Sequence, residues 1–120
     1  MGAETKTFYE ILGKEKIAEL VFHFYALVYE DPILSDLFQN DIAEVRDKQF
    51  RFLCQFLGGP PLYIETYGPP KMRMRHLPFV ITHEKKDAWL ACMNKAITQL
   101  NLDERLSQEL YSCFVPLAKN

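Results

Sequence analysis

Apolar residues recur at three- and four-residue steps along most of the chain, which is the spacing of one face of an α-helix. The longest stripe predicts a helix from Lys14 to Glu30, preceded by a short leading helix that Gly13 breaks. Asp31-Pro32 then predicts an N-cap and first turn of a further short helix through Leu37. The apolar positions of the long stripe are Ile17, Leu20, Val21, Phe24, Tyr25 and Val28.

A second long helix is predicted from about Ala43 to Leu57. The segment Gly58-Gly59-Pro60-Pro61 should end it, because glycine can adopt a left-handed cap and proline cannot continue the helix. From Pro60 to Pro70 the sequence has little periodicity but several aromatic residues, which predicts an ordered loop. The inward face of this helix could carry Val45, Gln49, Phe52, Leu53 and Phe56.

The last third of the chain predicts a helix from His83 to Leu100 with Thr82 as its N-cap, and a final helix capped by Asp103. Pro116 should fray the end of the final helix. No strand pattern occurs, so the expected class is all-α, as one domain over residues 1–120. The two buried stripes would be Ala88, Trp89, Cys92, Met93, Ala96, Ile97 and Leu100, and then Leu106, Leu110, Cys113, Phe114 and Leu117.

Composition and charge exclude some partners. The chain has 120 residues, 48% of them hydrophobic, with a net charge of −2 and a pI near 5.9, so nucleic acid is not expected as a partner. No apolar run approaches the ~20 residues that would span a membrane. The N-terminal residues lack a secretory pattern, and the three cysteines are odd in number and widely spaced. These features indicate reduced thiols in a cytoplasmic protein.

One histidine lies in an unusual setting, the segment Met72-Arg73-Met74-Arg75-His76-Leu77-Pro78-Phe79. The preceding Gly68-Pro69-Pro70-Lys71 predicts the start of a short helix, and Pro78 should stop it. Neutral imidazole is a ready metal ligand, and the neighbouring arginines suit a flat ligand with a metal centre and carboxylates at its edge. The alternative is a half-buried histidine packed against Leu77 and Phe79.

Three hydrogen-bonding side chains occupy faces that aliphatic residues would otherwise fill: Tyr25, Gln49 and Trp89, each on a different long helix. Buried polar groups require partners, so converging helices could bring these donors to one cavity. Alternatively, each is a separate core residue with its own partner. His23 has no partners at zinc-site spacing, and no Cys-x-x-Cys-His segment for covalent haem attachment occurs.

Taken together, these segments resemble a truncated haemoglobin of the second group. The resemblance covers nearly the whole chain and implies a two-over-two α-helical sandwich around a non-covalent haem b. The matching residues are Phe24-Tyr25, Asp31-Pro32, Leu37-Phe38, Lys48-Gln49, Leu57-Gly58-Gly59-Pro60, Tyr63, the Arg73–Phe79 segment and Trp89-Leu90.

The resemblance also implies roles for individual residues. His76 would be the proximal iron ligand. Arg75 and Lys48, with Tyr63 nearby and Arg73 in addition, would bind the haem propionates. The ligand pocket would contain Tyr25, Trp89, Gln49, Val45 and Phe38, and further cofactor contacts would come from Met72, Phe79, Phe52 and Met93. Because Val45 stands where vertebrate globins place a distal histidine, a pentacoordinate iron is expected.

The implied function is binding of O₂, and of NO, CO or peroxide, as small ligands. Donors from Tyr25, Trp89 and Gln49 would stabilise bound O₂ and slow its release, which suits redox chemistry more than transport. NO dioxygenase or peroxidase-like activity stays open, with an unidentified electron donor, and the chain is expected to be a monomer or weak homodimer. The alternatives are a cofactor-free helical interaction module and a haem-based gas sensor.

Overall fold

The computed structural model describes residues 6–35, 42–68 and 83–119, and within these ranges all regular structure is helical. The helices are α1 (Phe8–Glu30), α2 (Ile42–Phe56), α3 (Leu62–Tyr67), α5 (His83–Thr98) and α6 (Glu104–Lys119). The four long helices predicted from the sequence are therefore confirmed. Helix α1 begins at Phe8 instead of Lys14, because the expected leading helix continues into it across a kink at Gly13. None of the helices in the described ranges is long and apolar enough to cross a membrane.

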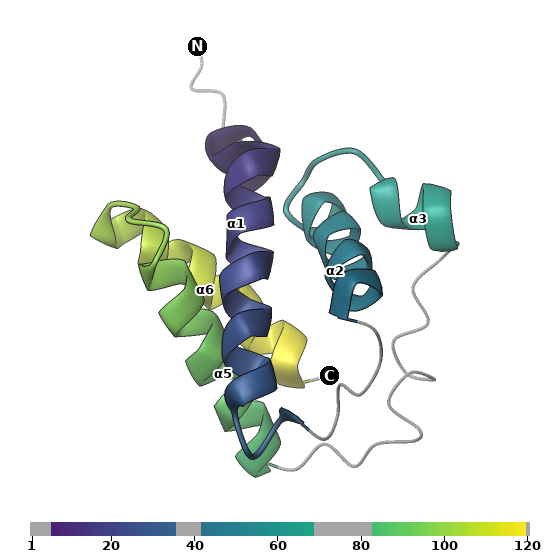
Figure 1. Ribbon diagram of the computed structural model, residues 1–120. Helices are drawn as coiled ribbons and strands as arrows, with labels where there is room; N and C mark the ends of the chain where they lie inside the picture. Colours follow the sequence, from purple (N-terminus) through teal and green to yellow (C-terminus); the bar gives the residue numbers. More distant parts are fainter. Residues whose placement is uncertain (1–5, 36–41, 69–82, 120) are drawn as a thin grey trace.

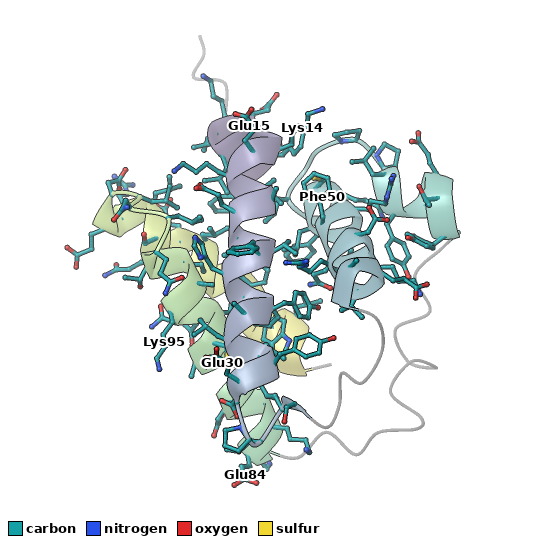
Figure 2. All side chains as sticks on the ribbon, viewed as in Figure 1. Lys14, Glu15, Glu30, Phe50, Glu84 and Lys95 are labelled. Carbon is teal, nitrogen blue, oxygen red and sulfur yellow. The ribbon has the colours of Figure 1, made fainter. Side chains whose placement is uncertain are left out.

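The long helices form two pairs (Figure 1). Helix α1 packs against α2 on one side and against α5 on the other, while α6 packs against α5 and the short α3 lies beside α2. The pair α1–α2 and the pair α5–α6 make up the two-over-two sandwich, so the expected fold is confirmed. Figure 2 shows the charged residues Lys14, Glu15, Glu30, Glu84 and Lys95 on the outside of this sandwich, where all five are exposed.

Helix α1 begins with a capping box. The Thr7 hydroxyl accepts a hydrogen bond from the Glu10 backbone N–H at 3.1 Å, and the Glu10 carboxylate accepts one from the Thr7 N–H at 2.9 Å. Gly13 has φ 77° and ψ 158°, which kinks the helix at the position where the sequence predicted a break. All six apolar positions of the predicted stripe are buried in the core.

Asp31 ends α1 and starts a turn. Its side-chain Oδ1 accepts from the Ile33 N–H at 2.8 Å, and its carbonyl accepts from the Ser35 N–H at 2.9 Å. Asp31 therefore acts as the cap that the sequence predicted. Residues 32–35 of the expected short helix form a turn, and residues 36 and 37 lie outside the described ranges.

The end of α2 is held against the start of α1. Gly58 has φ 97°, a conformation that favours glycine, and the Gly59 N–H donates to the Cys54 carbonyl at 2.8 Å. The Tyr9 N–H donates to the Leu57 carbonyl at 2.9 Å. A Cβ on Gly59 would lie 2.5 Å from the Tyr9 ring, so this glycine allows the two helices to meet.

Some details of the predicted elements were wrong. Residues 62–67 form α3 instead of a loop, because Pro61 and Ile64 carbonyls accept from the N–H groups of Glu65 and Gly68. Six residues are too few to display a helical period, which is why the sequence pattern missed them. On α2, Phe56 was expected to be buried on the inward face; it is 38% exposed, although its ring contacts that of Phe114 on α6 at 5.9 Å.

Helix α6 is capped at Asp103, whose Oδ1 accepts from the Leu106 N–H at 2.9 Å, as predicted. The helix continues through Pro116 to Lys119, so the expected fraying at Pro116 was wrong. Proline has a φ close to the helical value and here removes only one hydrogen bond near the helix end. The buried core of the second pair includes Leu90, which the predicted stripe omitted, together with Cys92, Met93, Ala96, Ile97, Leu100, Leu110 and Phe114.

Candidate functional site

A continuous series of aromatic rings connects the five helices. Neighbouring ring centroids lie between 4.9 and 6.3 Å apart, within the range of favourable aromatic pairs. We call this set the aromatic series. In order, it runs through Tyr29, Tyr25 and Phe24 on α1, Trp89 on α5, Phe114 on α6, Phe56 and Phe52 on α2, and Tyr63 and Tyr67 on α3.

Tyr25 is one of the buried tyrosines of this series, with 3% of its surface exposed. Burial, with a smaller contribution from Tyr29, raises the pKa of Tyr25 well above its usual value. The side chain therefore remains a neutral phenol at any physiological pH and keeps its O–H as a donor. Its ring lies 4.9 Å from that of Phe24, in an edge-to-face arrangement.

Trp89 is half-buried between α1 and α6. Its ring lies 5.2 Å from Phe24 and 6.2 Å from Phe114. Within the described ranges the indole N–H has no hydrogen-bond acceptor. Since indole can only donate, this group is available to a small ligand that offers an acceptor. Phe24 thus joins two candidate donors, Tyr25 and Trp89.

The predicted site residues on α2 and α3 lie at different depths. Gln49 and Val45 are half-buried and one helical turn apart, so they share a face of α2. Lys48 is partly exposed, with its Nζ 5.3 Å from the Tyr67 ring centroid and 3.9 Å from the Glu44 carboxylate. Tyr63 is buried, with its ring edge-to-face against Phe52 at 5.9 Å.

Of the predicted cofactor contacts, Met93 is fully buried in the core and Phe52 is half-buried. Phe52 stacks on Phe56 with an interplanar angle of 13° and a centroid separation of 5.8 Å. The partly exposed pair presents apolar surface that the described residues do not fully cover. The remaining predicted site residues lie outside the described residues: His76, Phe38, Met72, Arg73, Arg75 and Phe79.

Sequence reasoning missed the contacts between α2 and α3. The Tyr67 hydroxyl donates to Asp47 Oδ2 at 2.8 Å, and Arg51 Nε donates to the same oxygen at 3.0 Å. Tyr63 and Tyr67 have the four-residue spacing of one helix face, but a single such pair does not establish a helical period. Nothing in the sequence identified Asp47 as the partner, because the contact joins residues twenty apart across a glycine-proline turn.

The comparisons with known proteins identify the class. A family model described as bacterial-like globin matches residues 7–120. The group 2 truncated hemoglobin YjbI of Bacillus subtilis (strain 168) is 44% identical over 111 residues, which cover 92% of this chain and 84% of that protein.

Solved structures agree in fold. The group II truncated hemoglobin from Bacillus anthracis has a TM-score of 0.90 and 37% identity, over 98% of this chain and 91% of that one. The truncated oxygen-avid haemoglobin from Bacillus subtilis has a TM-score of 0.88 and 42% identity, over 95% and 97% of the two chains. The helices therefore have the arrangement of a truncated globin. The chain belongs to the bacterial-like globin family.

Membership of this family implies haem b as the cofactor and haem-based ligand binding as the general function. The described residues fit that cofactor. The partly exposed Phe52–Phe56 stack offers a flat apolar contact, and Lys48 offers a cation for a carboxylate. Trp89 offers an indole N–H that has no acceptor among the residues that the structure describes. The buried Tyr25 phenol, whose ring also contacts Phe24, offers a second donor.

Proposed function

We propose that the protein binds O₂ at haem b, and also NO and CO, and that hydrogen bonds from its pocket slow the release of O₂. The observation that carries the proposal is the pairing of Tyr25 and Trp89 through the Phe24 ring, with centroid separations of 4.9 and 5.2 Å. The similarity to a protein described as an oxygen-avid haemoglobin supports the same assignment.

Haem supplies an iron atom that binds diatomic gases. His76 is proposed to hold that iron through a ring nitrogen as the sole protein ligand, since neutral imidazole carries the required lone pair. Lys48, Arg75 and Arg73, with Tyr63 beside them, are proposed to bind the propionates, because hydrogen bonds between cations and carboxylates are the stronger kind. Met72, Phe79, Phe52 and Met93 would supply apolar contact.

In the ligand pocket, the proposed role of the side chains is to donate hydrogen bonds to the ligand and to exclude water. The Trp89 N–H and the Tyr25 O–H each donate to the diatomic ligand, and Gln49 adds a third donor. Val45 and Phe38 contribute apolar surface, which keeps water out and strengthens these bonds. Preorganised donors of this kind stabilise negative charge without reorganising.

Slow O₂ release favours redox chemistry over carriage, so we propose NO or peroxide as the second substrate, with an electron donor required for turnover. A haem-based sensor would instead need a partner that responds to the liganded state, and a cofactor-free interaction module would leave the Trp89 donor without a ligand. The hydrogen-bond donors proposed for the pocket favour redox chemistry over a sensor or an interaction module.

Spectroscopy of the ferrous protein under O₂, CO and NO tests the proposal. We expect a distinct visible spectrum with each gas, and oxidation of the oxygenated protein on addition of NO with release of nitrate. A protein that purifies colourless, folds stably and rejects added hemin would overturn the assignment and favour the interaction module.

A further inference from the structure

Tyr67 on α3 has a proton acceptor fixed beside its hydroxyl. The phenol O–H donates to Asp47 Oδ2 at 2.8 Å, and Arg51 Nε donates to the same oxygen at 3.0 Å. Arg51 Nη1 also donates to the Thr66 hydroxyl at 3.0 Å, which ties this cluster to α3. The Asp47 side chain is 45% exposed and Tyr67 is half-buried, so the pair can be reached from solvent.

Tyr67 is also the outer end of the aromatic series. Its ring lies 5.3 Å from that of the buried Tyr63, which contacts Phe52 at 5.9 Å. The series continues inward through Phe56 and Phe114 to Trp89, with steps of 5.8, 5.9 and 6.2 Å. Short separations between rings favour electron tunnelling, so the series offers a route for electrons between the surface of α3 and Trp89 on α5.

We propose that Tyr67 is a redox-active tyrosine through which a phenolic reductant from solvent supplies electrons to the haem after it has been oxidised by hydrogen peroxide. The inference rests on the peroxide chemistry of the proposed function and adds to it a site of electron entry. Tyr63, whose ring contacts those of both Tyr67 and Phe52, is the relay.

The electron balance closes with peroxide as the oxidant. Reduction of one hydrogen peroxide to two water molecules consumes two electrons and two protons. For each electron, Tyr67 is oxidised, its O–H bond breaks and the proton moves to Asp47, leaving a neutral tyrosyl radical beside a carboxylic acid. One solvent phenol then gives up an electron and releases its proton to water. That electron and the proton on Asp47 restore the Tyr67 phenol and the carboxylate.

The charges around Tyr67 favour this coupled transfer. In the resting state the Asp47 carboxylate raises the pKa of Tyr67, so the phenol keeps its proton. The hydrogen bonds from Tyr67 and Arg51 lower the pKa of Asp47, but an oxidised phenol is a far stronger acid than any carboxylic acid. The Lys48 ammonium, 5.3 Å from the ring centroid, disfavours positive charge on the ring and therefore favours loss of the proton.

Electron paramagnetic resonance of the ferric haem protein, frozen shortly after mixing with one equivalent of hydrogen peroxide, tests the proposal. We expect a tyrosyl radical signal that narrows when the protein contains ring-deuterated tyrosine. Tyr67→Phe keeps the ring but removes the hydroxyl, and most of the signal should be lost. Asp47→Asn, which accepts the proton poorly, should lose it too.

Tyr111→Phe is the matched control. Tyr111 is half-buried on α6 and makes no ring contact within the part of the chain that the structure describes, so its variant should keep the full signal. A spin-trap adduct mapped by mass spectrometry on the unmodified protein should fall on Tyr67, which requires no variant to fold.

The outcomes distinguish failure of the role of Tyr67 from failure of the peroxide chemistry of the haem. If peroxide changes the haem spectrum but the signal persists in Tyr67→Phe, or the adduct maps to another residue, the role of Tyr67 is overturned and the peroxide chemistry stands. If peroxide leaves the haem spectrum unchanged, the peroxide part of the proposed function fails, and the electron-entry role fails with it.

Discussion

At the residue scale, the two donors joined by Phe24 differ in what they can do. The Trp89 indole N–H can only donate, whereas the Tyr25 hydroxyl can donate to a ligand or accept from a neighbour. Tyr25 is 3% exposed and stays protonated because burial raises its pKa. A diatomic ligand would therefore find one fixed donor and one that can turn between partners.

The proposed iron ligand gives the first prediction. His76→Gly should lose most of its haem affinity, and added imidazole should partly restore the spectrum by entering the space left by the side chain. Absorption spectra with and without imidazole measure both effects.

The chain offers two controls for this experiment. His23 is half-buried with its ring edge-to-face to Phe22 at 5.6 Å, and His83 is exposed at the start of α5. His23→Ala and His83→Ala should retain the wild-type spectrum. If either of them loses the haem band while His76→Gly keeps it, the iron ligand was misassigned.

At the scale of elements, the contact between α1 and the end of α2 depends on Gly59, which has no side chain. A Cβ at position 59 would lie 2.5 Å from the Tyr9 ring and 2.8 Å from the Cys54 carbonyl oxygen. Gly59→Ala should therefore destabilise the protein by about 1–3 kcal/mol, the usual cost of overpacking. Urea denaturation followed by circular dichroism measures the change in the free energy of unfolding.

Removing the Tyr9 ring provides the control for that prediction. In a Tyr9→Ala background, Gly59→Ala should cost less than in the wild type, because one of the two clashes is gone. Equal stability of Gly59→Ala and the wild type would mean that the two helices do not approach this closely.

The contact between α2 and α3 predicts a pH dependence. Hydrogen bonds from Tyr67 and Arg51 lower the pKa of Asp47 in the folded state, so this carboxylate stabilises the fold above its unfolded pKa. The contribution is lost as the pH falls through the lowered pKa. Asp47→Asn should therefore melt at a lower temperature than the wild type at pH 7, and the difference should vanish in acid.

Asp87→Asn, at an exposed position of α5, is the control for Asp47→Asn and should leave the melting temperature unchanged at both pH values. A difference between Asp47→Asn and the wild type that persists undiminished in acid would assign the effect to something other than the charge of Asp47.

These elements also show that the sequence predicts long amphipathic helices well, but not short helices or the contacts between helices. The stripe of α1 was predicted residue by residue, because a long helix repeats its period several times and packing fills every inward position. Helix α3 was missed because six residues hold fewer than two turns. The Asp47–Tyr67 bond was missed because it depends on how two helices meet. The pairing of Tyr25 with Trp89 was expected only as convergence of long helices, and the ring of Phe24 that joins them was not foreseen.

At the scale of the whole molecule, the two helix pairs and the short α3 lie together (Figure 1). Aromatic residues from all five of these helices form the aromatic series. The family assignment supplies haem b, and the fold supplies donors from α1 and α5. The central claim is that these two donors, acting together, control how long O₂ stays bound.

Stopped-flow measurement of O₂ release from the ferrous protein tests that claim most directly. Losing a hydrogen bond to a charged acceptor costs ~1.5–3 kcal/mol, which corresponds to roughly a 10- to 150-fold faster release. Trp89→Phe should show an increase in this range, and Tyr25→Phe a smaller one because its hydroxyl can turn to another partner. Release at the wild-type rate from both variants would contradict the account, since neither side chain would then reach the ligand.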